Sequence, residues 1–243
     1  TAAPDATAGD KGRDGVVMGP GVTDSAIRLA TLSDMSGVFA TAGVSLAHAQ
    51  KVYFDKVNAD GGICGRKIEL DIKDTGYDVQ RTVTQYAQVR NEVLGMPAII
   101  GGPMNVALFD KLKADQSLAV PISWASSLLK SPHMMLTGPA SEYWVINSVE
   151  YLLEEDLVPA KAKIGVVHME GESGDAVLAG AKAAAQLTGV TLVPQQVKAT
   201  ATDMAGVVTS FKNAGVDGII LNSTPTMTAS VAGSAESAGL SVP

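Results

Sequence analysis

The sequence predicts an α/β fold made of two Rossmann-like lobes, each built on a parallel sheet. From Ala26 onward, short runs of branched residues alternate with amphipathic helical stretches, which is the pattern of strands covered by helices. An irregular stretch at 124–140, rich in serine, proline and glycine, interrupts this alternation. The length of 243 residues, with 46% hydrophobic residues, allows substantial buried cores. We therefore expect lobe one over 24–139 and lobe two over 140–243.

Seven runs are predicted to be strands, because branched apolar residues gather in them between turn residues. In chain order they cover residues 26–31, 67–72, 98–101, 120–123, 163–168, 191–195 and 218–221. Helices are predicted between them from the spacing of apolar residues. The clearest extends from Met204 to Phe211, with apolar residues at i, i+3, i+4 and i+7, and Asp203 is placed to cap its first turn or to add a favourable negative charge there. Two others are expected over 79–94, opened by Asp78, and over 145–153.

The two ends of the chain depart from this α/β pattern. Residues 1–23 are rich in Ala, Gly, Asp and Pro without a hydrophobic period, which predicts a disordered leader. Such a leader is what remains when an export signal or a lipid-attachment segment has been removed, although a cytosolic tail has the same composition. At 240–243 the strand and helix series stops where another strand should start, so lobe two is expected to be incomplete.

Composition and charge exclude several classes of function. The chain has 25 acidic and 18 basic residues and a net charge of -7, so neither nucleic acid nor an anionic membrane surface is an expected partner. No apolar run approaches the roughly 18 residues that cross a bilayer. One cysteine and three dispersed histidines offer no metal-ligand spacing, and neither of the two common glycine-rich phosphate loops occurs. No metal or other cofactor is therefore expected.

The residues that follow the predicted strands are candidates for ligand contact, because ligands of open α/β sheets bind at the carboxyl ends of the strands. Hydroxyls, amides, glycines and methionines dominate these positions, and such a set is suited to binding rather than catalysis. Serine, threonine and asparagine at helix starts can hold a carboxylate together with backbone N–H groups, yet the same residues are also ordinary helix caps. The candidates chosen by position are Phe39, Tyr77, Met104, Trp124, Ser126, Tyr143 and Glu170.

Acidic residues at the predicted strand ends leave two interpretations open. They are Asp34, Asp74, Glu170 and Glu172. Such carboxylates can receive an ammonium group or act as a paired acid and base, but they are also common as solvated loop residues. The serine pattern nearest to a nucleophile elbow, at 43–47, lies inside a predicted helix and lacks the final glycine. We therefore expect no enzymatic activity.

A longer motif resembles a known family. Residues 58–70 read Asn-Ala-Asp-Gly-Gly-Ile-Cys-Gly-Arg-Lys-Ile-Glu-Leu, after Met-Ser-Gly at 35–37 and Gly43, and before Asp74. The glycines permit a tight reversal between a helix and a strand. This arrangement resembles the branched-chain amino acid (Leu/Ile/Val) binding proteins of ABC transporters, and the similarity extends over 25–243.

The resemblance implies a type I periplasmic binding fold, in which two lobes close over a small ligand by hinge motion. It implies a membrane permease as partner and a location in the periplasm or on the outer face of the membrane, with lipid anchoring as one form of attachment. The family's ligand contacts carry over to Asn105, Ala125 and Ser127 in lobe one and to Ser173 and Thr224 in lobe two. Asn105 stands where the family has serine, and Ser173 and Thr224 where it has tyrosine, which puts a branched-chain amino acid ligand in doubt.

Three functions follow from these observations. The first is an extracytoplasmic solute-binding protein, not an enzyme, that captures a small amino-acid-like, amide or carboxylate ligand between two lobes for an ABC importer. Methionines near the strand ends favour a ligand with an apolar or aromatic body. The alternatives are a ligand-sensing domain of a receptor or regulator, and an α/β enzyme, which would need a phosphate loop, a metal cluster or a nucleophile with its base.

Overall fold

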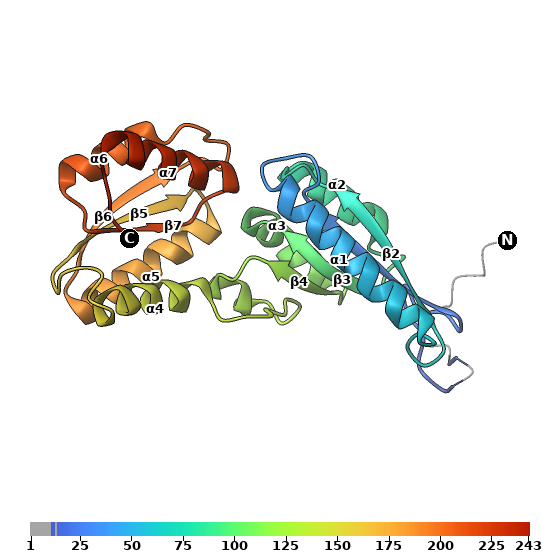
Figure 1. Ribbon diagram of the computed structural model, residues 1–243. Coiled ribbons are helices and arrows are strands. Elements are labelled where there is room, and N and C mark those ends of the chain that lie inside the picture. The colour runs from blue at the N-terminus through green and yellow to red at the C-terminus, as the bar shows by residue number, and fades with distance from the viewer. Residues whose placement is uncertain (1–10, 13) are drawn as a thin grey trace. The chain divides into compact units, whose positions relative to one another are not determined.

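The computed structural model of the chain describes residues 11, 12 and 14–243, and the chain divides into two compact units (Figure 1). Unit 1 extends to Ser123 and also includes Ser131–Thr137. Unit 2 consists of Trp124–Lys130 and Gly138–Pro243. The change of unit falls inside the irregular stretch of the sequence, and residues 124–130, which the sequence analysis assigns to lobe one, cluster with unit 2.

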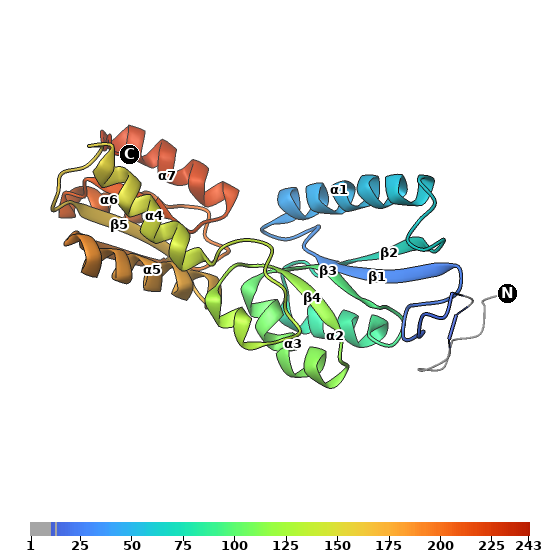
Figure 2. The same ribbon diagram turned by 90° about the horizontal axis from the view of Figure 1, so that it is seen from below.

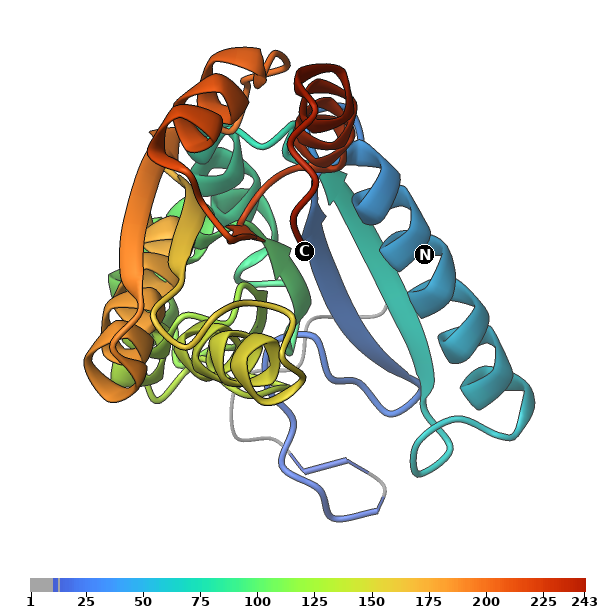
Figure 3. The same cartoon turned by 60° about the vertical axis from the view of Figure 1, so that its left-hand side comes forward.

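Unit 1 is a parallel sheet covered by helices on both faces. Its elements are β1 (Ala26–Ser33), α1 (Ala40–Ala59), β2 (Lys67–Asp74), α2 (Val79–Val89), β3 (Gly95–Ile100), α3 (Gly102–Ala114) and β4 (Leu118–Ile122). The strands lie in the order β2-β1-β3-β4, and all neighbouring pairs are parallel. Helix α1 lies along β1 and β2 on one face, while α2 and α3 cover the other (Figures 2 and 3). Leu32, Ile99, Leu108 and Leu112 are fully buried between these layers.

Unit 2 has a second parallel sheet with the same layering. Its elements are the 3-10 helix η1 (Ser126–Lys130), α4 (Ser141–Glu154), β5 (Lys163–Met169), α5 (Glu172–Thr188), β6 (Thr191–Val197), α6 (Ala205–Ala214), β7 (Gly218–Leu221) and α7 (Pro225–Ala238). The strand order is β6-β5-β7, again parallel. Helices α4 and α5 pack together on one face of this sheet, and α6 and α7 cover the other (Figure 1).

The core of unit 2 lies on both faces of its sheet. Successive side chains of a strand point to opposite faces, so Ile164 and Val166 of β5 pack on the same side, in a buried cluster with Val145 of α4. On the other side, Phe211 of α6 is fully buried, and a Cβ added at Gly165 would lie 3.1 Å from its ring. The absence of a side chain at Gly165 therefore makes room for the Phe211 ring against the sheet.

The two units share one strand order around a central strand. The order β2-β1-β3 of unit 1 corresponds to β6-β5-β7 of unit 2. In each unit the helix after the central strand approaches the end of that strand at a glycine. A Cβ added at Gly43 in α1 would lie 1.8 Å from the Asp34 carbonyl oxygen, and one added at Gly174 in α5 would lie 1.7 Å from the Met169 carbonyl oxygen. Each glycine lets the first turn of its helix, α1 or α5, lie against the carboxyl end of the central strand of its own sheet, where ligand contacts are predicted.

All seven predicted strands are confirmed, and so are helices near 79, 145 and 204. The Asp78 carboxylate accepts a hydrogen bond from the Arg81 N–H at 2.7 Å as α2 begins. The helix expected over 79–94 is shorter than predicted and ends at Val89. Apolar residues continue at helical spacing beyond Val89, but they lead into the sheet instead of the helix. There the Leu94 N–H donates to the Arg28 carbonyl of β1 at 2.9 Å.

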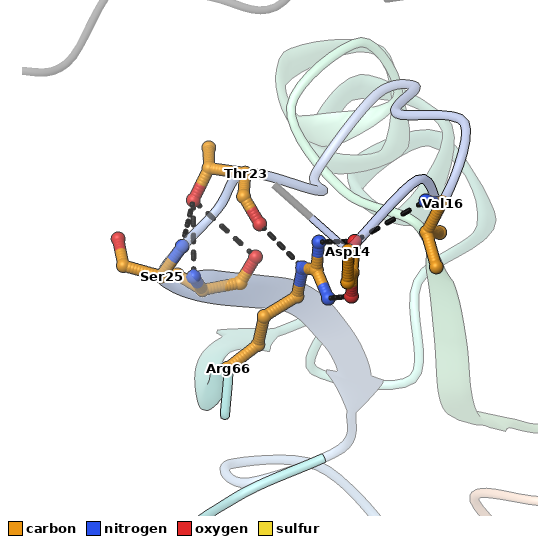
Figure 4. A network of polar contacts seen from close by, with 6 residues as sticks. Asp14, Val16, Thr23, Ser25 and Arg66 are labelled. Atoms are coloured by element: carbon orange, nitrogen blue, oxygen red, sulfur yellow. Dashed lines mark hydrogen bonds and ion pairs between the residues drawn. The ribbon is translucent and has the colours of Figure 1, made fainter. Parts of the chain in front are cut away.

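The segment before β1 is fastened to unit 1 by a buried arginine. Arg66 forms a two-pronged ion pair with Asp14, and its Nε donates to the Thr23 carbonyl at 2.7 Å (Figure 4). The hydrogen bonds from Arg66 hold the pKa of Asp14 far below its ordinary value. Residues 11, 12 and 14–23 therefore have defined contacts, although their composition predicts disorder. The prediction fails because Arg66 holds this segment by polar contacts, and the hydrophobic period of a sequence does not reveal such contacts. The remainder of the expected leader lies outside the described residues.

Candidate functional site

In unit 1 the loop after β1 is built around the carboxylate of Asp34. This side chain is fully buried, and its Oδ1 accepts the Gly37 N–H at 2.6 Å while its Oδ2 accepts the Phe39 N–H at 2.7 Å. A buried carboxylate needs such donors to offset the loss of its hydration. Asp34 therefore shapes the loop that carries Phe39, and the ammonium-receiving role weighed from the sequence has less support here.

The carboxylate of Asp74 ties the loop after β2 to the loop after β1. Its Oδ1 accepts the N–H groups of Met35 at 2.9 Å and Gly76 at 3.0 Å. Its Oδ2 accepts the Ser36 hydroxyl at 2.7 Å and the Arg81 guanidinium at 3.2 Å. Partial burial acts to raise the pKa of Asp74, but these hydrogen bonds and the charge of Arg81 outweigh it and lower the pKa. Asp74 is thus held in its ionised form as a junction between two loops.

Phe39, Tyr77 and Met104, three predicted contacts, belong to one cluster beside Gly101. The rings of Phe39 and Tyr77 lie 4.9 Å apart between centroids, inclined at 48°. A Cβ added at Gly101 would lie 2.8 Å from Tyr77 Cε2 and 2.9 Å from Met104 Sδ, and the φ of this glycine is +101°. Met104 lies in α3 rather than in a loop and is buried, so its role in this cluster is packing beneath the aromatic pair.

Asn105, carried over from the family resemblance, is fully buried in the first turns of α3. Its Nδ2 donates to the Ile99 carbonyl at 3.0 Å and to the Gly101 carbonyl at 2.8 Å. Its Oδ1 is buried and has no hydrogen-bond partner among the described residues. An unpartnered buried acceptor costs about 1–3 kcal/mol. Asn105 thus closes the β3–α3 turn and keeps one acceptor free for a donor group.

In unit 2 the two serines of the crossing segment donate to carboxylates on the following helices. The Ser126 hydroxyl donates to Glu142 Oε1 at 2.6 Å, and the Ser126 N–H lies 3.3 Å from both Glu142 oxygens. The Ser127 hydroxyl donates to Glu172 Oε1 at 2.6 Å. Glu142 and Glu172 lie in the first turns of α4 and α5, where the helix dipole favours negative charge. These bonds join η1 to α4 and α5, and the hydrogen of each serine hydroxyl is donated to a carboxylate.

A pair of tryptophans flanks these serines. The rings of Trp124 and Trp144 lie 5.3 Å apart between centroids, and a Cβ added at Gly138 would lie 3.3 Å from Trp124 Nε1. The Ser141 N–H donates to the Trp124 carbonyl at 2.6 Å, which joins the crossing segment to the start of α4. Ala125, another predicted contact, is buried, and its carbonyl oxygen accepts the Leu128 N–H at 3.1 Å.

The remaining predicted contacts of unit 2 follow β5 and β7. Asn222 accepts the Met169 N–H at 3.0 Å through Oδ1 and donates to the Ser173 hydroxyl at 3.3 Å through Nδ2, so it fixes the β5–α5 turn. Thr224 is buried and its hydroxyl accepts the Met227 N–H at 3.3 Å as the cap of α7. Thr224 therefore fits the helix-cap interpretation that the sequence left open.

Both units match one known family. The periplasmic binding protein family matches this chain over residues 26–243. This chain belongs to the periplasmic binding protein family. The curated Leu/Ile/Val-binding protein homolog 8 of Brucella abortus (strain 2308) is 23% identical over 211 residues, which are 81% of this chain and 51% of that protein. The chain thus spans about half the length of this curated relative, and the resemblance to branched-chain amino acid binding proteins is confirmed.

Solved structures of periplasmic binding proteins have the same α/β fold. A fatty acid ABC transporter substrate-binding protein from Thermomonospora curvata is 38% identical with a TM-score of 0.93, covering 96% of this chain and 60% of that chain. A branched-chain amino acid ABC transporter protein from Thermus thermophilus with bound valine is 19% identical with a TM-score of 0.78, covering 90% and 57%. The latter similarity shows the fold alone, which is that of type I periplasmic binding proteins.

Several residues of this binding-protein site were missing from the predicted contacts. They are Glu142, Trp144 and Asn222. Glu172 was predicted only as an acid that could receive an ammonium group or act in an acid and base pair, and its bond to Ser127 was not foreseen. Glu142 could have been found from its position in the first turn of a predicted helix, and Asn222 from its position directly after a strand. Tyr143 and Glu170, in contrast, are predicted contacts with exposed side chains.

The described residues contain neither a metal-binding group nor a membrane-spanning helix. No group of three or more histidine, cysteine, aspartate or glutamate residues within 11, 12 and 14–243 could hold a metal ion. Across that same part of the chain, no helix is both long and apolar enough to cross a membrane.

Proposed function

We propose that this chain is the ligand-capturing part of an extracytoplasmic solute-binding protein that delivers its ligand to the permease of an ABC importer. The observation that carries this proposal is the family match over residues 26–243, which includes the strands and helices of both units. Members of a periplasmic binding family act outside the cytoplasm, so we place this protein in the periplasm or on the outer face of the membrane. A lipid anchor is the form of attachment that we propose for it.

The ligand is proposed to contact residues of both units. Unit 1 offers the free Oδ1 of Asn105 and the aromatic pair of Phe39 and Tyr77 at the carboxyl edge of its sheet. Unit 2 offers Ser126 and Ser127, whose hydroxyls donate to carboxylates but whose oxygens can still accept, beside its two tryptophans. An apolar surface with a few hydrogen-bonding groups is the usual composition of a small-molecule site. These residues hold and orient a ligand, and we propose no chemical step for them.

The ligands named for two similar proteins indicate a class. One of those proteins is a fatty acid ABC transporter substrate-binding protein, and the other contains bound valine. A fatty acid and valine share an aliphatic body and a carboxylate. We therefore propose a small amino-acid-like, amide or carboxylate ligand, with an aliphatic or aromatic body that packs against the aromatic residues of each unit.

A thermal-shift and calorimetric panel tests this function. The complete mature protein is titrated with leucine, valine, hexanoate, octanoate and hexanamide, and each mixture is followed by NMR for product. A ligand at 100 times its Kd stabilises the folded state by about 2.7 kcal/mol, which raises the melting temperature measurably. We expect at least one member to do so without being converted. A folded protein that is stabilised by no member, or that turns one over, contradicts the proposal.

A pair of asparagine variants locates the ligand. Asn105→Ala removes the free acceptor of the β3–α3 turn, while Asn91→Ala changes an exposed residue of the same unit. We expect Asn105→Ala to weaken binding at least tenfold and Asn91→Ala to leave it within twofold, with the melting temperature of each unliganded variant as the control for folding. Equal affinities in the two variants would place the ligand elsewhere.

A further inference from the structure

The Ser127 hydroxyl already has a carboxylate partner inside unit 2. It donates to Glu172 Oε1 at 2.6 Å, and both residues are partly buried. A serine hydroxyl has a single hydrogen to donate. While that hydrogen is donated to Glu172, a ligand oxygen cannot receive it. The carboxylate of Glu172 therefore already makes the hydrogen bond with Ser127 that the carboxylate of a ligand would make.

The consequence for a ligand depends on its head group. A carboxylate that approaches Ser127 must displace Glu172 and then lie near its negative charge, and like charges at such distances repel strongly in a partly desolvated site. An amide head group meets neither obstacle, because its N–H groups can donate to Glu172 while the Ser127 bond stays intact. The neighbouring bond from Ser126 to Glu142, also 2.6 Å long, brings a second carboxylate to η1.

We propose that Glu172 is a specificity-determining residue of the ligand site, which occupies the Ser127 hydroxyl and so selects uncharged head groups over carboxylates. This inference rests on the proposed function, since it assigns a role at the same site. It goes beyond that function because it predicts that amides bind more tightly than carboxylates, whereas the proposed function makes no distinction between them. It also assigns to Glu172 a role that differs from the helix-dipole contribution of an acidic residue in the first turn of α5.

The test compares hexanoate with hexanamide, which differ only in the head group, by calorimetric titration of the complete protein. The variant Glu172→Gln removes the charge, and the control Asp175→Asn removes an exposed charge from the same first turn of α5. We expect the wild-type protein to bind hexanamide at least tenfold more tightly than hexanoate. In Glu172→Gln this ratio falls by about tenfold, equivalent to ~1.4 kcal/mol. In Asp175→Asn it stays within twofold, because an exposed charge is screened by water and salt.

A second pair of variants separates competition for the hydroxyl from simple repulsion. Glutamine still accepts the Ser127 hydroxyl, so this test uses Glu172→Ala, which removes the acceptor. If Glu172 acts by holding the Ser127 hydroxyl, then Glu172→Ala improves hexanoate binding less in a Ser127→Ala background, where no hydroxyl is left to release. An equal improvement in both backgrounds would contradict the competition. An unchanged ratio in Glu172→Gln overturns this inference while binding itself upholds the proposed function. Failure of every variant and of the wild-type protein to bind either probe overturns the proposed ligand class and this inference with it.

Discussion

Unit 1 and unit 2 have the same strand order around β1 and β5, but the carboxylates at their sheet edges have different partners. In unit 1, Asp34 accepts two backbone N–H groups, and Asp74 accepts two more in addition to a hydroxyl and a guanidinium. In unit 2, Glu172 accepts the hydroxyl of Ser127, and Glu142 accepts the hydroxyl of Ser126 together with its N–H at a longer distance of 3.3 Å. The same chemical group thus fixes loops in one unit and engages candidate ligand contacts in the other.

This difference shows why position alone does not give a carboxylate its role. A backbone N–H is fixed by the chain, so a carboxylate that satisfies it is part of the loop structure and cannot be released without unfolding that loop. A serine hydroxyl rotates about one bond and can exchange its partner. Acids bound to hydroxyls are therefore the ones that a ligand can displace or recruit.

The largest expected effect tests what the units have in common. Gly43→Ala and Gly174→Ala each place a Cβ less than 2 Å from a strand-end carbonyl oxygen, at 1.8 Å and 1.7 Å. The helix must move away, and we expect each variant to lose about 3 kcal/mol of unfolding free energy, measured in urea. Gly233→Ala in α7, where the added Cβ meets no atom within 4 Å, is the matched control and should gain about 0.5–1 kcal/mol. If Gly43→Ala and Gly174→Ala both unfold with free energies close to that of the wild type, then the helices do not pack this closely on the strand ends.

The next largest effect tests the contrast between the units. Asp34→Ala leaves the N–H groups of Gly37 and Phe39 without their acceptor in a buried loop, so we expect a loss of about 2 kcal/mol in unfolding free energy. Glu172→Ala removes the acceptor of a hydroxyl that can turn to water, and we expect about 0.5 kcal/mol or less. Urea unfolding of both variants under one set of conditions measures the difference. Equal losses would remove the distinction between fixed and exchangeable carboxylates.

A third test concerns another hydroxyl-bound carboxylate of unit 1, Asp115, which accepts the hydroxyl of Tyr86 at 2.7 Å and also pairs with Arg90. Tyr86→Phe leaves that ion pair in place, so we expect a loss of about 1 kcal/mol at pH 7. Burial, together with the nearby Asp115, raises the pKa of Tyr86 above its ordinary value of 10.0. The tyrosine therefore stabilises the fold below that pH, and its advantage over Tyr86→Phe should shrink as the pH rises above 10.0. A difference that stays constant to higher pH would contradict this assignment.

The smallest expected effect is confined to the segment before β1. The lowered pKa of Asp14 means that its pairing with Arg66 contributes fully above the ordinary carboxyl value of 3.8 and is lost as the pH falls below it. We expect Asp14→Asn to accelerate amide exchange in residues 14–24 at neutral pH while leaving the β1 core protected. The exchange rates of variant and wild type should converge in acid. Acceleration that extends through β1 would show that this segment is coupled to the whole of unit 1.

Much of the fold was predictable because it rests on local patterns. Strands such as β5 and β7 are short apolar runs between turn residues, and the period of α6 from Met204 to Phe211 appears directly in the sequence. The end of α2 was not predictable, since Val93 and Leu94 continue the helical period but serve the sheet. Strand order was also beyond the sequence alone, because it depends on pairings between distant segments.

The candidate site was predictable in part for the same reason. Phe39 and Tyr77 were found from their places after strands, and they do lie against each other. The partners of Ser126 and Ser127 were not found, because Glu142 and Glu172 lie 16 and 45 residues further along the chain. Thr224 illustrates the opposite difficulty, since a residue that suits a ligand contact is equally suited to cap a helix.

Methionine methyl groups provide the most direct test of the central claim, that the ligand contacts the carboxyl edges of the two sheets. Met35, Met104 and Met169 lie at these edges, while Met96 lies at the opposite end of β3 and Met18 before β1. The protein is labelled with 13C at the methionine methyls and titrated, by NMR, with the compound that stabilises it most. The account predicts that the resonances of Met35, Met104 and Met169 shift while those of Met96 and Met18 stay in place. Shifts at Met96 and Met18 alone would contradict it.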